Sequence, residues 1–117
     1  MLQSARSLKL TVEQGLDRLP GPAGERFVEM FRRGGLLVEL YAPRGRDPQT
    51  PHTRDELYLV HRGEGWFVHE DVRERFGPGD LLFVAAGVSH RFEDFSDDLT
   101  VWVAFFGPEG GEVPRER

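Results

Sequence analysis

Apolar and polar residues alternate with a period of two along most of the chain from Glu25 to Phe106. This period is typical of β-strands, in which successive side chains point to opposite faces. It predicts strands over residues 26–32, 36–41, 56–61, 66–69, 72–76, 81–84, 89–93 and 99–106. The last of these segments is almost continuously apolar, so we expect that strand to be covered on both faces.

Glycine- and proline-rich segments separate the predicted strands, and they indicate tight turns. The segments 33–35, 62–65 and 77–80 are of this kind, and a longer polar loop runs from Pro43 to Pro51. Ahead of the strands, Thr11 followed by Gln14 is a helix-capping pattern. It predicts one short helix that ends near Leu19, because Pro20 and Pro22 cannot continue it.

A series of about eight short strands with one short helix in front predicts an all-β sandwich or barrel. The chain has 117 residues, which is enough for one domain. We expect an N-terminal arm and short helix over residues 1–24, the barrel over 25–108, and a flexible C-terminal tail over 109–117.

Charge and composition narrow the classes of partner. The formal net charge is −5 and no Lys/Arg cluster is present, so we expect no nucleic acid partner. The absence of Cys excludes disulfides and thiolate ligands. No segment approaches the about 20 apolar residues of a membrane span, and the first residues lack the apolar core of a secretory signal. We therefore expect a cytoplasmic protein without a membrane partner.

Three residues carry the candidate chemistry: His52, Glu56 and His90. Two imidazoles and one carboxylate form the ligand set of a metal site with open coordination positions. On a straight strand, however, positions four apart lie about 13 Å from each other. His52 and Glu56 can therefore meet only on a helical turn that starts at Thr50, or at a bend over residues 53–55. We favour the bend, because residues 57–60 look extended.

Period two places Glu56, Tyr58 and Val60 on one face of their strand, and His90, Phe92 and Asp94 on one face of another. His90 would then point inward beside an aromatic neighbour. The alternative to metal binding is a buried hydrogen-bonded pair of His and Glu. His61 and His69 are weaker candidates, because His61 lies opposite in parity to Glu56 and His69 is next to a hairpin tip.

The spacing of these residues resembles the two motifs of the cupin superfamily. Gly45, His52, Glu56 and Gly63 match the first motif, and Gly79, Gly87 and His90 match the second. The chain departs from the motifs at three positions. Thr50 stands where the family has another His, Ala85 replaces a Pro, and Asp94 replaces an Asn.

The resemblance implies a small double-stranded β-helix, which is a jelly-roll barrel, with a metal in its mouth. The ligands would be His52, Glu56 and His90. Gln49 could supply a weak oxygen ligand, although parity favours Thr50, and water could fill the position instead. The metal would be one divalent transition ion, and the N and O donors do not distinguish Fe, Mn, Ni, Co, Cu or Zn.

A barrel of this kind encloses a small-molecule pocket. We expect its lining to come from Thr50, Tyr58, Trp66, Phe92, Trp102, Glu39 and Tyr41. The first hypothesis for function is a metal-dependent oxygenase- or isomerase-type enzyme acting on a small polar organic molecule. The alternative is a non-catalytic module that binds a sugar or metabolite. A third hypothesis is a dimerisation domain that pairs through residues 99–106 and the N-terminal arm, and the resemblance itself implies a homodimer.

Overall fold

A computed structural model describes residues 5–115 of the chain. The described residues form one helix and eight strands: α1 (Val12–Leu16), β1 (Phe27–Arg33), β2 (Leu36–Tyr41), β3 (Asp55–Arg62), β4 (Gly65–His69), β5 (Val72–Phe76), β6 (Leu81–Val84), β7 (His90–Glu93) and β8 (Thr100–Phe106). Each predicted strand is confirmed to within one residue at each end.

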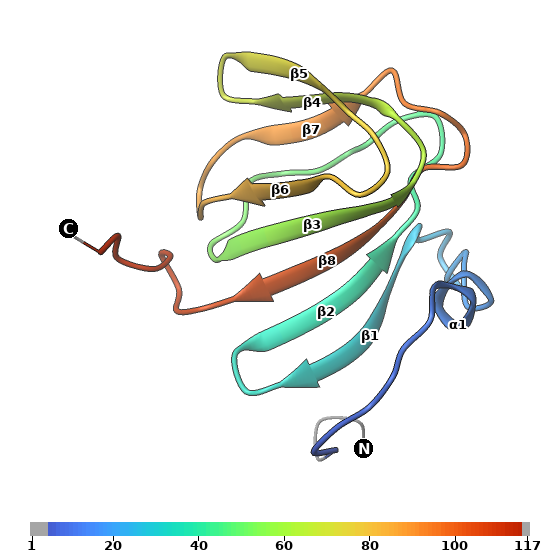
Figure 1. The fold of residues 1–117 in the computed structure, drawn as a ribbon, viewed down its shortest axis with the longest axis horizontal. Helices are drawn as coiled ribbons and strands as arrows, with labels where there is room; N and C mark the ends of the chain where they lie inside the picture. The colour runs from blue at the N-terminus through green and yellow to red at the C-terminus, as the bar shows by residue number, and fades with distance from the viewer. Residues whose placement is uncertain (1–4, 116–117) are drawn as a thin grey trace.

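The strands form two antiparallel sheets that face each other, which confirms the predicted jelly-roll barrel (Figure 1). The larger sheet has the order β1-β2-β8-β3-β6, and the smaller one has the order β5-β4-β7. The chain crosses from the larger to the smaller sheet between β3 and β4, where Gly63 has a φ of 97°. A Cβ at Gly63 would lie 2.6 Å from Cα of Leu99, so only glycine fits this crossing.

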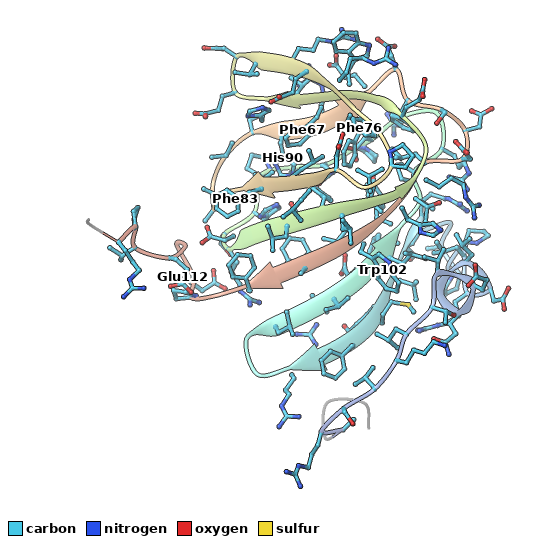
Figure 2. All side chains as sticks on the ribbon, in the orientation of Figure 1. Phe67, Phe76, Phe83, His90, Trp102 and Glu112 are labelled. Carbon is cyan, nitrogen blue, oxygen red and sulfur yellow. The ribbon has the colours of Figure 1, made fainter. Side chains whose placement is uncertain are left out.

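The core lies between the two sheets and is built from the inward-facing residues of both. Its fully buried members are Tyr58, Val60, Phe67, Phe76, Val84, Phe92, Leu99, Val101 and Val103. Phe67 and Phe76 mark this core in Figure 2. Their burial follows directly from the period-two pattern, since alternate residues of each strand face the opposite sheet.

A second, smaller cluster lies on the outer face of the larger sheet. Helix α1 covers this face, and Val12 packs there with Met30 of β1 and Leu40 of β2. The predicted cap is confirmed, because Thr11 and Gln14 exchange side-chain and backbone hydrogen bonds of 2.9 and 3.2 Å. The helix ends at Leu16, and turns with i to i+3 hydrogen bonds continue to Leu19.

The expected faces of β3 are confirmed. Glu56, Tyr58 and Val60 are each 1% exposed, whereas Leu59 is 45% exposed on the opposite face. In and just after β7, only two of the three residues expected to face inward do so. His90 and Phe92 are buried, but Asp94 has a φ of 47°, which turns it away from the core. Its carboxylate pairs with Arg73 at 2.7 Å, so Asp94 lies on the surface.

The predicted apolar strand, β8, lies between β2 and β3 and is hydrogen-bonded on both edges. It therefore has no free edge for pairing with a second copy, contrary to the dimerisation hypothesis. The outer face of the same sheet instead exposes Leu59, Leu81 and Phe83, which are 45%, 64% and 56% exposed.

The described part of the C-terminal segment is held against the loop before β3. The amide of Gly110 donates to the carbonyl of Thr53 at 2.6 Å, and the amide of Glu112 donates to Asp55 at 2.9 Å. Residues 1–4 of the expected arm and 116–117 of the expected tail lie outside the described residues. Within residues 5–115, no helix has the length and apolar character needed to cross a membrane.

Candidate metal centre

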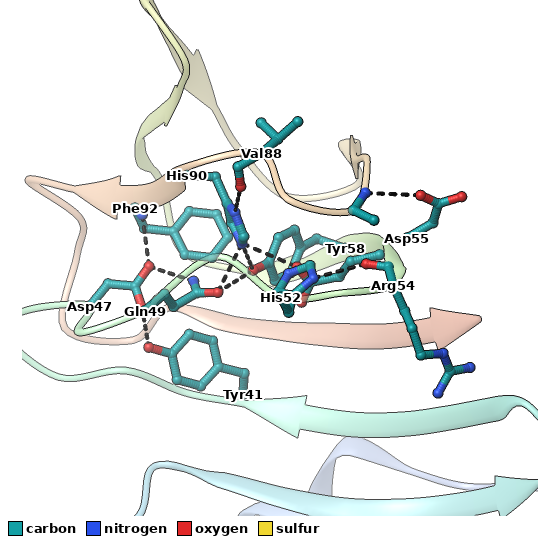
Figure 3. Close-up of polar contacts among 12 residues, drawn as sticks. Tyr41, Asp47, Gln49, His52, Arg54, Asp55, Tyr58, Val88, His90 and Phe92 are labelled. Atoms are coloured by element: carbon teal, nitrogen blue, oxygen red, sulfur yellow. Dashed lines mark hydrogen bonds and ion pairs between the residues drawn. The ribbon is translucent and has the colours of Figure 1, made fainter. Parts of the chain in front are cut away.

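His52, Glu56 and His90 bring their donor atoms together. Figure 3 shows the rings of His52 and His90 close to each other. Nε2 of His52 lies 2.6 Å from Oε1 of Glu56, and Nε2 of His90 lies 3.2 Å from the same oxygen. One donor atom from each residue lies within 4.8 Å of the other two. Glu56 and His90 are buried, and His52 is half-buried.

A bend in the chain makes this meeting possible. Thr53 and Arg54 form the bend, and Asp55 already starts β3, so the predicted bend is confirmed and the helical alternative is wrong. Two hydrogen bonds join the bend to the segment that precedes His90. The amide of Gly87 donates to the carbonyl of His52 at 2.7 Å, and the amide of Ala86 donates to Oδ1 of Asp55 at 2.9 Å.

Both imidazoles are oriented by backbone carbonyls. Nδ1 of His52 lies 2.9 Å from the carbonyl oxygen of Arg54, and Nδ1 of His90 lies 2.9 Å from that of Val88. A carbonyl oxygen only accepts hydrogen bonds, so each Nδ1 must carry the proton. In the neutral ring, Nε2 then presents a lone pair, which is the form that binds a metal.

This arrangement directs two nitrogen lone pairs at one carboxylate oxygen. Such contacts repel each other unless a proton or a cation lies among them. Burial lowers the pKa of His90, but its hydrogen bonds to Glu56 and Val88 and the nearby charges of Glu56 and Asp47 outweigh this effect and raise the pKa. A divalent cation satisfies the same three donor atoms at once, so the donor set fits a transition metal.

Gln49 and Tyr58 complete the polar surroundings of His90. Oε1 of Gln49 lies 3.1 Å from Nε2 of His90, and the Tyr58 hydroxyl donates to that Oε1 at 2.6 Å. The Tyr58 oxygen is itself 3.1 Å from Nε2 of His90. Burial, together with the charges of Glu56 and Asp47, raises the pKa of Tyr58, so the hydroxyl keeps its proton.

Thr50 was expected to face the metal site and Gln49 to face away, but the structure shows the opposite. The side chain of Gln49 points toward His90, whereas Thr50 is exposed at the edge of the cavity. Sequence reasoning also missed Asp47, whose carboxylate is buried and accepts a hydrogen bond from Gln49. No regular pattern marked it, because Asp47 lies in the irregular loop between β2 and β3.

A cavity of about 420 Å³ opens beside the three donors. Of the expected lining residues, Glu39, Tyr41, Thr50 and Tyr58 line it, together with His52, Glu56, Val103, Phe105 and the two arginines Arg26 and Arg46. The cavity is therefore mixed in character, with apolar side chains from β8, carboxyl groups from β2 and β3, and arginines from the loops. Its size suits a small organic molecule.

Three residues expected in the lining lie elsewhere. Trp66 packs under the guanidinium of Arg73, which is 4.3 Å from the centre of its ring. Phe92 belongs to the core between the sheets, and Trp102 packs in the cluster beneath α1. Each of these placements follows strand parity, since Trp66 and Trp102 alternate with the inward residues Phe67 and Val103.

Besides Tyr58, two further cavity residues have shifted pKa values. Burial, with the charges of Glu56 and Glu29, raises the pKa of Glu39 to about 7. Burial, together with the hydrogen bond to Asp47 and its charge, raises the pKa of Tyr41. Tyr41 therefore stays a neutral phenol, and its hydroxyl donates a hydrogen bond to Asp47.

The weaker histidine candidates lie outside this site. His61 is exposed on the outer face of β3. His69 pairs with Glu74 at 2.6 Å, the same distance as His52 and Glu56. Among residues 5–115, however, His52, Glu56 and His90 form the one group of three or more ligand-type side chains with converging atoms. His69 therefore offers a comparison pair without a third donor.

Comparisons with known proteins agree with this geometry. The family model described as "Cupin domain" matches residues 37–106, a range that contains all three donors. An uncharacterized protein of Streptomyces coelicolor is 34% identical over 85 residues, which are 71% of this chain and 81% of that protein.

Two further similarities extend the comparison. The acireductone dioxygenase of Leishmania infantum is 33% identical over 82 residues, which are 56% of this chain but only 24% of that protein. A cupin 2 conserved barrel domain protein of Salinispora arenicola has a similar structure, with a TM-score of 0.65 at 14% identity, over 88% of this chain and 90% of that one. At this identity the structural similarity shows the fold alone.

Proposed function

We propose that this chain, which belongs to the cupin domain family, holds one divalent transition metal through His52, Glu56 and His90. The observation that carries the proposal is the direction of the two Nε2 atoms. Backbone carbonyls accept hydrogen bonds from both Nδ1 atoms, so both Nε2 atoms face Oε1 of Glu56. A site built only as a hydrogen-bonded His–Glu pair needs one imidazole, whereas this one has two.

We further propose that the protein acts on a small polar organic molecule in the cavity. When bound, the metal would supply Lewis-acid or oxygen chemistry at the cavity floor. The chain's own residues have separate tasks. Val103 and Phe105 line the cavity and exclude water, and the carbonyls of Arg54 and Val88 hold the imidazole rings. Tyr58 keeps a proton on its hydroxyl oxygen, which it donates to Gln49.

The similarity to the acireductone dioxygenase supports the oxygenase class over the isomerase class. The matched region is only 24% of the dioxygenase, so the similarity covers one part of that enzyme. Oxygenase-type activity therefore remains a proposal for this chain.

The second candidate function is non-catalytic binding of a small ligand. Two observations favour it. Thr50 stands where the cupin motif has a His, and the group nearest to His90 from this loop is the neutral amide of Gln49. An amide oxygen is a weaker ligand for late transition metals than an imidazole nitrogen. Turnover of a substrate that disappears in His90→Ala would exclude this candidate.

We also propose that the protein forms a homodimer through the outer face of β3 and β6. Leu59 and Leu81 are paired across these two strands, and Phe83 extends the same exposed apolar surface. This surface lies at the end of the larger sheet, away from the part covered by α1. A second copy of the chain would bury it.

Titration of metal-free protein with Mn(II), Fe(II), Co(II), Ni(II) and Zn(II) tests the metal proposal. We expect binding of one equivalent in the native chain and a loss of at least about a hundred-fold in affinity in His52→Ala or His90→Ala. His69→Ala is the matched control, because it breaks an equally close His–Glu pair without changing the site. Binding that is absent in the native chain, or unchanged in His52→Ala, would overturn the proposal.

A further inference from the structure

The carboxylate of Asp47 is 9% exposed in the loop between β2 and β3, and it accepts three hydrogen bonds. Oδ2 accepts from the amide of Phe92 at 2.8 Å and from Nε2 of Gln49 at 2.6 Å. Oδ1 accepts from the hydroxyl of Tyr41. Three donors compensate its charge, so its place in the loop is closely defined (Figure 3).

The polarity of the Gln49 amide follows from these partners. A carboxylate only accepts hydrogen bonds, and the amide nitrogen of Gln only donates them. Nε2 of Gln49 must therefore face Asp47, which leaves Oε1 directed toward Nε2 of His90 and the hydroxyl of Tyr58. The reversed amide would place two oxygens against each other and would present an NH₂ group, which has no available lone pair, to the metal donors.

We infer that Asp47 is a positioning residue that turns the oxygen of Gln49 toward the metal, so that Gln49 serves as a fourth ligand in place of the imidazole missing at position 50. This inference rests on the proposed metal centre. Asp47 does not touch the metal in this account and acts only through Gln49.

The carboxylate of Asp47 also connects strand β7, which carries His90, with strand β2. Its bond to the amide of Phe92 holds β7 two residues beyond His90, and its bond to Tyr41 reaches the wall of the cavity on β2. Asp47 therefore defines where Gln49 sits relative to His90, as well as which end of its amide faces inward.

Asp47→Leu tests the inference, because Leu has a similar shape but lacks the oxygen that accepts from Nε2 of Gln49 and from the amide of Phe92. The readout is the affinity for Co(II), followed by its visible absorption during titration of metal-free protein. We expect the affinity to fall about ten-fold, the lower end of the range for groups that orient metal ligands. Gln49→Leu should lose at least as much.

The double variant Asp47→Leu/Gln49→Leu separates positioning from a general structural effect. If Asp47 acts through Gln49, the double variant should bind Co(II) no more weakly than Gln49→Leu. His69→Ala is the control, since it breaks a His–Glu pair outside the site, and its affinity for Co(II) should stay within about two-fold of the native value. An equal loss of affinity from Asp47→Leu in the native chain and in the Gln49→Leu variant would overturn the inference.

A measurement on the native chain covers the case in which Asp47→Leu does not fold. Addition of one equivalent of Zn(II) should shift the NMR signal of the side-chain carbonyl carbon of Gln49, together with the ring signals of His52 and His90. Ring shifts without a Gln49 shift would contradict this inference alone. Absence of all three shifts would contradict the metal proposal, so the two failures are distinguishable.

Discussion

Oε1 of Glu56 lies 2.6 Å from Nε2 of His52, although the two residues are four positions apart where the chain enters strand β3. On an extended strand the two positions would be about 13 Å apart. The bend at Thr53 and Arg54 closes this distance, and the bond from Gly87 to the carbonyl of His52 ties the bend to the segment before His90. This one bend thus brings His52 next to Glu56 and holds both near the segment that carries His90.

Glu39→Gln should stabilise the metal-free protein in a pH-dependent way. The folded pKa of Glu39 is about 7, above its ordinary value of 4.5, because the carboxyl is buried. Its contribution to stability is therefore most favourable below pH 4.5 and is lost as the pH rises through about 7. The variant should have a higher free energy of unfolding than the native chain at pH 8.5 and no such gain at pH 4.5. Urea unfolding at both pH values checks this, and a gain of the same size at pH 4.5 would contradict the account.

Tyr58→Phe should show the contribution of the hydroxyl group separately from that of the ring. The ring packs against Phe92 in the core, and the hydroxyl bonds to Gln49. We expect loss of the hydrogen bond to lower the free energy of unfolding by about 1 kcal/mol. Metal stoichiometry should stay at one, because Tyr58 is not among the proposed ligands. Chemical denaturation and metal titration provide the two readouts, and loss of metal binding would require Tyr58 to be a ligand.

Gly63→Ala should destabilise the barrel through both strain and a clash. The new Cβ would meet the backbone of Leu99, and the φ of 97° is unfavourable for alanine. Gly79→Ala is the matched control, since its φ is 88° but no heavy atom lies within 4 Å of the added Cβ. The control should lose about 1–3 kcal/mol from strain alone, and Gly63→Ala should lose clearly more. Equal losses in thermal or urea unfolding would show that the contact with Leu99 is unimportant.

Phe83→Glu tests the proposed dimer. Phe83 is 56% exposed on β6, so the change should leave the fold intact while placing a charge in the apolar surface. Light scattering should give a dimer for the native chain and a monomer for the variant. Phe27→Glu is a control of similar exposure, at 48%, on β1 at the opposite end of the sheet. A native monomer, or dissociation by the control alone, would contradict the proposed interface.

The sequence predicted the strands and the three converging donors because both depend on regular periodicity and on motif spacing. It did not predict the exchange of roles between Gln49 and Thr50. These residues lie in an irregular loop, where Pro48 and Pro51 restrict the backbone and period two does not apply. Asp47 escaped notice for the same reason, since its role depends on contacts with Tyr41 and Phe92, which are distant in sequence.

The lining of the cavity shows a different limit. Trp66 and Trp102 were expected in it because of their size and chemistry, although parity places them opposite Phe67 and Val103. Trp66 instead stacks with Arg73 on the smaller sheet, and Trp102 lies in the cluster beneath α1. Strand parity was a better guide to these positions than residue type.

The central claim is that the Nε2 atoms of His52 and His90 are metal ligands, held in that role by protonated Nδ1 atoms. Long-range ¹H–¹⁵N NMR of histidine-labelled protein tests it directly, by comparing metal-free protein with protein that contains one equivalent of Zn(II). We predict that Nε2 of His52 and His90 shifts on metal addition, that both Nδ1 atoms stay protonated, and that the signals of His61 and His69 do not move. Unchanged Nε2 signals at His52 and His90, or shifts of equal size at His69, would contradict the account.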